Sequence, residues 1–504
     1  MDDLLNTLPP EIVLQIIDYL PPSTTAHLTR LSKTWHSFID SAHQDRIYSH
    51  PSKVDRPLTT TTSKSHTFSS LTHPQSCFTT YYHSTTSWKD LCRRQTLLHK
   101  NYNNTTQPPT TRESIYQIDI SQVWRFRPDF KRRFIISTSE LGGVHVTDMD
   151  SGEELWGDEM VREFAHLEYD METGTAVWDA FGDILEVWRV DENEEDGQRG
   201  KFKRVKVLKH DCQTRGFQIG HGHLSVVSSQ GKAFVYDIHP AVKKKLDLEI
   251  APRAIGHLCQ NEEVVMFSMG ERGYHIHSKE TGKLLGVLNP ARCPNSGHVQ
   301  HLELSDFCLR DPSMIMCPTV PPFPPQDPRT DRVALNHIES GSHPEQPNCR
   351  LDRDEWGAGL LDGDVMAGVS RAGRVFICSN WRETISSEDA YETTTSIVEC
   401  ETSSRSFDLG GWLTLRNGKV AIEVDDCVYL MNVDVDVSGE KRSPVWAVRT
   451  GSSRQSRAPV SFMAIWDDCF MYTYVTYCPL PGLDANIMTP VKTIRVLSFA
   501  PDLE

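Results

Sequence analysis

Residues 8–20 read Leu8-Pro9-Pro10-Glu11-Ile12-Val13-Leu14-Gln15-Ile16-Ile17-Asp18-Tyr19-Leu20, and Pro21-Pro22-Ser23 follows. Proline is tolerated in the first turn of a helix, and a glutamate there complements the positive end of the helix dipole. The segment therefore predicts a short helix that the second proline pair ends. Its apolar residues recur at helical spacing on one broad face, namely Ile12, Val13, Ile16, Ile17 and Leu20.

Two more short helices are predicted before residue 50. Ser23 is expected to cap the second helix, which Leu28 and Leu31 mark. Ser32 is expected to cap the third, in which apolar residues fall at i, i+3 and i+4: Trp35, Phe38 and Ile39. Three amphipathic helices in about forty residues have almost no core of their own. The excess of apolar positions indicates a docking element that completes its burial against a partner.

This segment resembles an F-box, which shares the Leu-Pro-x-Glu opening, the Ile/Leu-rich first helix, the Leu-x-x-Leu second helix and the late tryptophan. The resemblance implies that residues 1–50 bind a Skp-type adaptor, which bridges to a cullin and its RING subunit. By the same resemblance, the residues that face the adaptor are Leu8, Pro9, Ile12, Ile16, Leu20 and Leu28. Structural roles within the module fall to Glu11, Leu31, Trp35, Phe38 and Ile39. The alternative is a three-helix cap on a larger domain.

The length of 504 residues predicts two or three domains. Lys and Arg total 52 against 68 Asp and Glu, a net charge of -16, which disfavours nonspecific binding to nucleic acid or anionic membranes. The acidity belongs to the part after residue 100, where 42 basic residues face 60 acidic ones. The chain starts with acidic residues and has no run of 18 apolar residues, so a soluble protein of the cytoplasm or nucleus is expected. The 13 cysteines are scattered without a Cys-x-x-Cys pair, which indicates reduced thiols.

Residues 51–112 are predicted to form a polar linker. The stretch 51–87 is rich in Thr, Ser and His and has few apolar anchors. A short helix is predicted near 87–99, with Trp88 and Leu91 on one side. It resembles the Trp-containing helix that often joins an F-box to its substrate domain.

From about residue 113 the pattern changes to short alternating strands separated by turn signals, which predicts a mainly β domain over 113–504. Thr147, Trp188, Tyr236 and Ile276 occupy similar positions in successive strands, at spacings of 41, 48 and 40 residues. Such spacings are typical of WD-repeat blades. Three further positions, at Ile377, Leu430 and Val496, bring the expected number of blades to seven.

The expected fold is therefore α+β and multidomain: a three-helix F-box followed by a degenerate, WD-repeat-like, seven-bladed propeller. The wide spacing before Ile377 predicts an insertion, and residues 318–358, which begin with a Pro-rich run, are expected to be irregular or disordered. True Trp-Asp dipeptides are missing at the expected strand ends, so the repeat is degenerate. A pair of β-sandwiches or another all-β fold is the alternative.

No catalytic, metal-binding or cofactor-binding residue is identified in the sequence. His275-x-His277 and His221-Gly222-His223 have spacings that metals use, but neither pair has an obvious third ligand. Phosphate-binding glycine loops and a nucleophile elbow are absent. The acidic run 191–196 and the basic triplets 131–133 and 243–245 are expected to be exposed loop charge.

These patterns, with the resemblance, predict a non-catalytic substrate receptor of a Skp-cullin-F-box ubiquitin ligase, whose propeller binds an unknown protein substrate. Propeller-bearing F-box proteins often bind phosphorylated segments through arginines, but the acidity of this chain does not support that choice. The substrate-binding residues stay unassigned. Two alternatives are a scaffold that binds the adaptor without directing degradation, and a propeller enzyme, for which no converging set of catalytic residues is visible.

Overall fold

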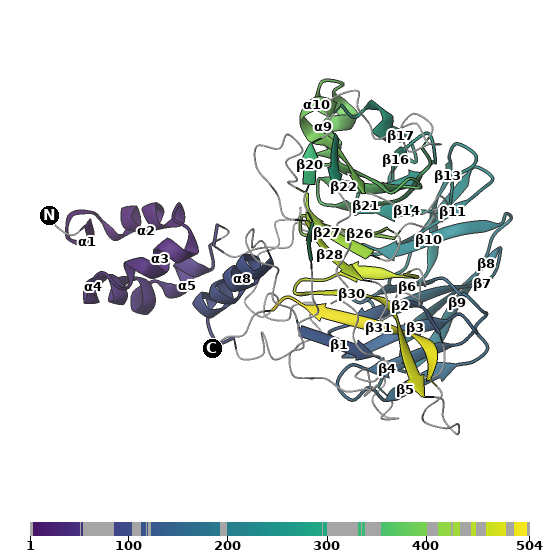
Figure 1. The fold of residues 1–504 in the computed structure, drawn as a ribbon, viewed down its shortest axis with the longest axis horizontal. Coiled ribbons are helices and arrows are strands. Elements are labelled where there is room, and N and C mark those ends of the chain that lie inside the picture. The colour runs from purple at the N-terminus through teal and green to yellow at the C-terminus, as the bar shows by residue number, and fades with distance from the viewer. Residues whose placement is uncertain are drawn as a thin grey trace.

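The computed structural model shows a group of short helices at one end of the molecule and a ring of sheets that forms the rest (Figure 1). None of the described helices is long and apolar enough to cross a membrane. The structure describes residues 4–50, 52–53, 85–102, 112–116, 118, 122–191, 199–294, 296–299, 331–333, 335–337, 354–400, 412–424, 427–433, 445–449, 460–479 and 488–500.

The N-terminal part is divided into more helical segments than the three predicted. They are α1 (Leu4–Thr7), α2 (Pro10–Asp18), α3 (Pro22–Leu28), α4 (Lys33–His36), a π-helical turn η1 (Ser37–Ala42) and α5 (Gln44–Tyr48). A longer helix, α8 (Trp88–Tyr102), falls where a helix near 87–99 was predicted and continues beyond it. The rest of the predicted linker, 54–84 and 103–111, lies outside the described residues.

One of the two predicted helix caps is present. The backbone N–H of Trp35 donates to the Ser32 hydroxyl oxygen at 3.2 Å, which confirms Ser32 as the N-cap of α4. The prediction for Ser23 is wrong, because α3 starts one residue earlier, at Pro22, with Pro21 in the N-cap position and no side-chain cap. Proline fits the first helical position because its missing N–H has no partner to lose there.

The helical part encloses a small hydrophobic core. Trp35 and Ile39 are buried, and Phe38 is partly buried with its ring centroid 6.4 Å from that of Trp35. Leu31 does not contribute, contrary to the structural role predicted for it, because α3 ends before it and its side chain is 68% exposed. Glu11 lies exposed in the first turn of α2.

Seven sheets in the described part of the chain follow one another around a ring, each built on four antiparallel strands, which is the architecture of a seven-bladed β-propeller. Blades 1 and 2 contain β2 (Val123–Asp129), β3 (Phe134–Ser139), β4 (Val144–Asp148), β5 (Glu154–Asp158), β6 (Leu167–Asp170), β7 (Thr175–Phe181), β8 (Ile184–Val190) and β9 (Phe202–Lys209). Blades 3 and 4 contain β10 (Thr214–Gly220), β11 (His223–Ser228), β12 (Lys232–Asp237), β13 (Lys243–Glu249), β14 (Leu258–Gln260), β15 (Val264–Ser268), β16 (Tyr274–Ser278) and β17 (Leu284–Leu288).

The last three blades complete the ring. Blades 5 and 6 contain β21 (Trp356–Asp362), β22 (Val365–Ser370), β23 (Arg374–Cys378), β24 (Thr395–Cys400), β25 (Leu413–Arg416), β26 (Lys419–Val424), β27 (Cys427–Asn432) and β28 (Val445–Arg449). Blade 7 contains β29 (Met463–Ile465), β30 (Cys469–Pro479), β31 (Met488–Ser498) and β1 (Arg112–Tyr116). Short helices, η3 (Pro290–Arg292), α9 (Trp381–Ser386) and α10 (Ala390–Thr394), connect strands near blades 4 and 5.

Blade 7 closes the ring, because its outer strand comes from the beginning of the propeller. β1 pairs antiparallel with β31, from Arg112 opposite Ser498 to Tyr116 opposite Ile494. Closure leaves no open end at which a blade would expose its face.

The hydrophobic core of the ring lies between the blades. One cluster of buried apolar residues fills each contact between neighbouring sheets in the described part of the chain. Between blades 1 and 2, for example, Val146 and Phe134 pack with Trp178 and Phe202. Each blade is therefore stabilised by both of its neighbours.

All seven positions predicted to be equivalent fall on the third strand of their blades. In the fourth blade, however, the predicted position, Ile276, is one residue too early. A β-bulge toward the outer strand lies immediately before Thr147, Trp188 and Tyr236, and the same bulge lies immediately before His277 rather than Ile276. Alternation of apolar residues locates a strand but does not reveal where an extra residue enters it.

The insertion predicted to be irregular over 318–358 contains two short strands, β19 (Asp331–Val333) and β20 (Leu335–His337), and β21 begins within it. β19 pairs with β28 of blade 6, while β20 pairs with β18 (Ser296–Val299), which lies parallel to β24 of blade 5. The outer edges of two blades offer unpaired backbone groups, so short segments without a strand-like pattern can extend them. The remaining predicted residues, 318–330, 334 and 338–353, lie outside the described residues.

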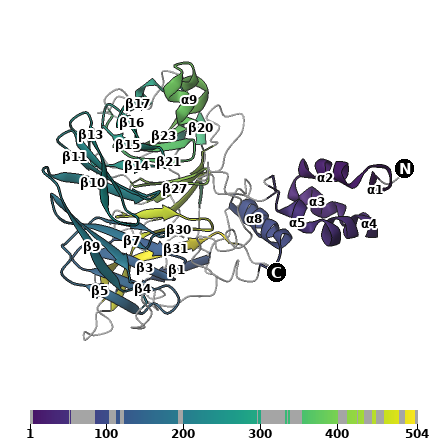
Figure 2. The same cartoon turned by 180° about the vertical axis from the view of Figure 1, so that it is seen from behind.

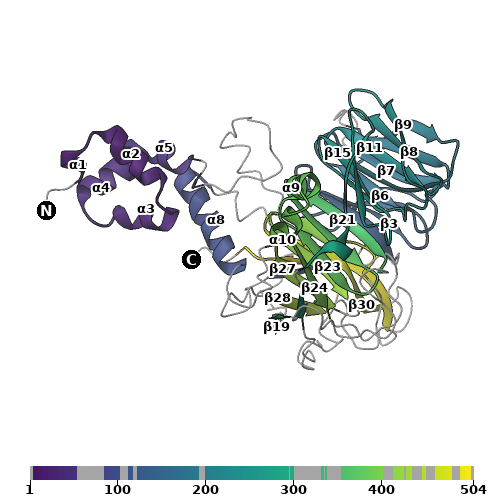
Figure 3. The same ribbon diagram turned by 90° about the horizontal axis from the view of Figure 1, so that it is seen from above.

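The connectivity defines two faces of the propeller. Within each blade, the turn between the first and second strands lies at one face, and the turn between the second and third lies at the other. Helix α8 contacts the first of these faces, because Lys419, at the β25–β26 turn, and Phe499, after the third strand of blade 7, both touch Tyr102. We call this the α8 face and the opposite one the distal face. Figures 2 and 3 show α8 between the N-terminal helices and the sheets.

Candidate functional site

Helix α2 has one buried and one exposed apolar face. Val13 and Ile17 are buried in the helical core, at 2% and 1% exposure. Ile12 and Ile16 are 41% and 43% exposed, and Tyr19, directly after the helix, is 90% exposed. The spacing of i, i+4 and i+7 places these three residues on one side of the helix. We call Ile12, Ile16 and Tyr19 the α2 stripe.

The six residues predicted to face an adaptor are not all equally accessible. Ile12, Ile16 and Pro9 are exposed, and Leu20 is half-buried. The other two, Leu8 and Leu28, pack in part against the helical core. Sequence reasoning missed Tyr19, although its position seven residues after Ile12 would have indicated it.

Charged contacts hold the end of α2. Arg46 donates two hydrogen bonds to the Asp18 carboxylate, at 3.1 and 2.9 Å, and this pairing holds the pKa of Asp18 below its ordinary value. The Lys53 ammonium donates to the backbone oxygens of Ile17, at 2.6 Å, and Leu20. A cation at the carboxyl end of a helix satisfies its last carbonyls and complements its dipole. The α2 stripe is therefore presented by a fixed helix.

Helix α8 belongs to two hydrophobic cores. At one end, Leu91 and Cys92 are buried among residues of the N-terminal helices, and the Cys92 thiol donates to the backbone oxygen of Tyr48 at 3.3 Å. At the other end, Leu98 and Tyr102 are buried with residues of blades 6 and 7. A single helix that is part of both cores fixes the helical part relative to the propeller.

The chain after the last strand strengthens this joint. The Asn101 amide donates to the backbone oxygen of Phe499 at 2.7 Å, and the rings of Tyr102 and Phe499 have centroids 4.5 Å apart. The next residue, Ala500, is buried in the same core as Leu91. Phe499 and Ala500 therefore belong to the two hydrophobic cores that α8 joins.

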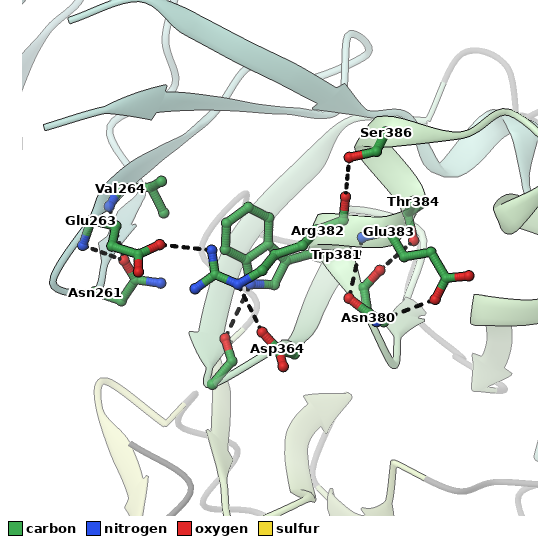
Figure 4. A network of polar contacts seen from close by, with 11 residues as sticks. Asn261, Glu263, Val264, Asp364, Asn380, Trp381, Arg382, Glu383, Thr384 and Ser386 are labelled. Carbon is green, nitrogen blue, oxygen red and sulfur yellow. Dashed lines mark hydrogen bonds and ion pairs between the residues drawn. The ribbon is translucent and has the colours of Figure 1, made fainter. Parts of the chain in front are cut away.

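An open pocket of about 790 Å³ lies on the α8 face, where the β14–β15 turn meets α9. Figure 4 shows its central cation, Arg382, whose guanidinium donates to Glu263 and Asp364 at 2.8 Å each and lies 4.4 Å from the centroid of the Trp381 ring. The Trp381 indole donates to the backbone oxygen of Gly363 at 3.1 Å. Because Arg382 is paired with two carboxylates, this network holds α9 against blade 4 and leaves no charge on Arg382 for a ligand.

Lys279 also lines this pocket, but it is 1% exposed. Its ammonium donates to the backbone oxygen of Asn261 at 2.7 Å, and burial lowers its pKa to about 7. The bond connects two turns of blade 4, which is a structural role.

Burial lowers the pKa of all four histidines in the two pairs. Burial, with nearby cations, lowers the pKa of His223 and of His275 to about 4, and the pKa values of His221 and His277 are also lowered. His277 Nδ1 lies 3.1 Å from the backbone oxygen of Gly282. Among the described residues, no three His, Cys, Asp or Glu side chains are placed to share a metal ion.

Much of the charge predicted to be exposed loop charge is paired. Arg132 and Arg133 are half-buried, and they bind Asp129 and Asp150, respectively. In the second triplet, Lys244 binds Asp247 at 2.8 Å and Lys245 binds His223 at 2.9 Å. Of the acidic run, Asp191 binds Lys203 at 2.9 Å, and residues 192–196 lie outside the described residues.

Comparison with known proteins agrees with this geometry at the N-terminus. Residues 5–48 match the family model described as F-box-like, so the chain contains an F-box-like domain. A search of curated proteins found no significant match. Among solved structures, the chain resembles the β-propeller domain of Cps50 (Swd1) from Myceliophteria thermophila, with 11% identity and a TM-score of 0.43 over 77% of this chain and 99% of that one. The number of blades comes from the sheet topology alone.

Proposed function

We propose that this protein is the substrate-recognition subunit of a Skp-cullin-F-box ubiquitin ligase. The F-box-like domain at residues 5–48 carries the proposal. It binds a Skp-type adaptor, and through it a cullin and a RING subunit, while the propeller binds a protein substrate. The chain contributes no catalytic residue, and it acts in the cytoplasm, the nucleus or both.

The exposed apolar face of α2 supports the adaptor part of the proposal. A helix whose inner face is already buried has no need of a second apolar face within its own domain. The proposed contacts are Leu8, Pro9, Ile12, Ile16, Leu20 and Leu28, to which the structure adds Tyr19 as a further candidate.

The double connection of α8 supports the receptor part. A receptor accelerates transfer by raising the effective concentration of its substrate near the transfer machinery. A rigid joint between the adaptor-binding and substrate-binding parts restricts the positions at which the substrate is held. A flexible linker would not impose this restriction. The buried contacts of Leu91 and Tyr102 at the two ends of α8 supply such a joint.

The test is adaptor binding by the full chain carrying Ile12→Asp with Ile16→Asp. These residues are better targets than Leu8, because substitution of a partly buried residue also disturbs the helical core. The exposed part of the two isoleucines accounts for about 2 kcal/mol of apolar burial, and a buried unpaired carboxylate costs more, so a loss of at least about 30-fold in affinity is expected.

Leu284→Asp with Leu285→Asp is the matched control, because these residues are 50% and 49% exposed but lie on the propeller. We expect this control to bind the adaptor as the wild type does. Equal binding by all three proteins would refute the assignment of the adaptor contacts. Binding of the adaptor without cullin recruitment would instead favour a scaffold that does not direct degradation.

A further inference from the structure

The distal face of blades 1 and 2 exposes a group of large apolar side chains. Leu141 lies in the β3–β4 turn, Met160 and Phe164 lie between β5 and β6, and Phe181 ends β7. Their exposures are 71%, 91%, 48% and 72%. The turns at β3–β4 and β7–β8, and the connection between two blades, lie on the distal face by the connectivity described above. We call these four residues the distal patch.

The loops that carry the distal patch are bound to one another. The Phe164 N–H donates to the backbone oxygen of Ser139 at 3.2 Å, and the Gly143 N–H donates to that of Val161 at 2.9 Å. The two blades are joined further by Asp179, which accepts from the backbone N–H of His166 at 2.6 Å and also binds Arg162. The loops that carry the distal patch are therefore held in fixed positions by these contacts.

Phe164 has a backbone conformation that aromatic residues rarely adopt. Its φ is 51°, in the left-handed region, and its ring meets that of Trp124 edge-on with centroids 5.2 Å apart. The surrounding hydrogen bonds thus hold a large, half-exposed ring in an unfavourable conformation, an arrangement that is concentrated at binding sites.

Beside Trp124 lies Arg125, which forms no ion pair with any residue that the structure describes. Its side chain is 6% exposed, and its Nε and Nη1 atoms have no hydrogen-bond partner among the described residues. Its guanidinium lies 4.8 Å from the centroid of the Trp124 ring and 3.9 Å from that of Trp412, which precedes the first strand of blade 6. The first strands of neighbouring blades adjoin around the centre of the ring, so Arg125, near the start of β2, lies toward the distal side of that centre.

The neighbouring cations are neutralised within the described part of the chain. Arg127 binds Glu168, Arg162 binds Asp179, and Lys492 binds Glu140 at 2.8 Å. Among these described cations, Arg125 alone forms no direct ion pair, because the carboxylates that act on it, Glu168 and Asp179, are bound to Arg127 and Arg162. A buried unpaired charge is costly, and the cation–π contacts compensate for it only in part.

We propose that the distal patch and Arg125 together bind a substrate segment in which one carboxylate is flanked by large apolar side chains. The single uncompensated charge selects the ligand: a carboxylate balances it, whereas a phosphate carries a charge of about -1.5 to -2 and would need further donors. The apolar side chains of the segment cover the distal patch. This inference rests on the proposed function, because it identifies the substrate face of the receptor, on the side of the ring opposite α8.

The experiment selects phage-displayed random peptides against the full-length protein and measures the affinity of the selected peptides by fluorescence anisotropy. We expect a consensus of one Asp or Glu flanked by Leu, Met or Phe. Replacing that acid with its amide should weaken binding at least tenfold. A phosphoserine in its place should not restore the affinity. A consensus without an acid, or tighter binding of the phosphorylated peptide, would overturn the proposal.

Variants of the protein then locate the site. Met160→Asp with Phe181→Asp should abolish peptide binding, and the control Leu284→Asp with Leu285→Asp should not. Arg125→Met should also abolish binding without lowering the melting temperature, because it removes an unpaired buried charge. A lower melting temperature would show that Arg125 is structural and would contradict the proposal.

One further variant separates this inference from the proposed function. Ile12→Asp with Ile16→Asp should bind the peptides normally, since the α2 stripe lies at the opposite end of the molecule (Figure 1). Peptide binding by a protein that fails to bind any adaptor would leave the distal site in place and refute only the ligase role. If the protein binds an adaptor but selects no peptide, the ligase role stays in place and only the distal site is refuted.

Discussion

Replacing Leu91 with alanine is expected to weaken the joint between the F-box-like domain and α8. Leu91 is fully buried in the core that α2, α4, α5 and α8 share. Removing a buried leucine side chain costs its transfer free energy together with the energy of the cavity left behind, about 2–5 kcal/mol in total. We take about 3 kcal/mol as the central value, because a helical module this small has few other contacts with which to fill the space.

Hydrogen exchange of backbone amides in the full chain measures this change locally. About 3 kcal/mol corresponds to an increase of about 100-fold in the exchange rate of amides that open together with this core. The increase should appear in α2 and α8 and should be absent from β8, in the middle of blade 2, which serves as an internal reference.

Leu31→Ala is the matched control, because it makes the same substitution in the same domain at a side chain that is 68% exposed. We expect it to change stability by less than about 0.5 kcal/mol. If Leu91→Ala accelerates exchange by less than about threefold, or if Leu31→Ala has an equal effect, α8 is not part of the core of the F-box-like domain.

Three further predictions concern caps, buried charges and pH. Ser32→Ala should destabilise the helical domain by about 1 kcal/mol through loss of the α4 cap, whereas Ser23→Ala should have little effect, as judged by chemical denaturation. Arg374→Ala should lower the melting temperature by removing the cation bound to the buried carboxylates of Asp354 and Glu399, at a cost of about 3–5 kcal/mol, while Arg371→Ala, in an exposed ion pair, should cost about 1 kcal/mol or less. Because the folded pKa of His223 is about 4, below the unfolded value of about 6.5, stability should fall as the pH decreases from 6.5 towards 4. His223→Gln should reduce the slope of melting temperature against pH between 6.5 and 5, and an unchanged slope would contradict the assignment.

The local chemistry of the N-terminal segment was readable from the sequence. The proline pair, the spacing of Ile12 to Ile17 and the Ser32 cap are local features, and each acts within one or two helical turns. The same holds for the third strands of the blades, which the alternating pattern located. Errors arose where two local signals competed, as at Ser23, where the preceding proline starts the helix instead.

The candidate sites required the three-dimensional arrangement. Apolar periodicity does not distinguish Ile12 and Ile16 from Val13 and Ile17, because all four lie on adjacent faces of one helix, and only the resemblance to an F-box selected the first pair. Only the packing of α2 against its neighbours decides which pair is buried. Likewise, Arg125 and Trp412 are far apart in the sequence and meet only because the ring brings blades 1 and 6 to a common centre.

By itself, the sequence determined the existence of an N-terminal helical module and of a repeated β domain, because helical and strand periodicities are set by neighbouring residues. The tertiary structure alone decided that β1 closes blade 7, that α8 is shared by two cores and that Arg125, which has no direct ion pair within the described residues, lies beside an exposed apolar patch. The physical reason is that burial and charge compensation depend on residues that are distant in the chain, and no local pattern records which of them meet.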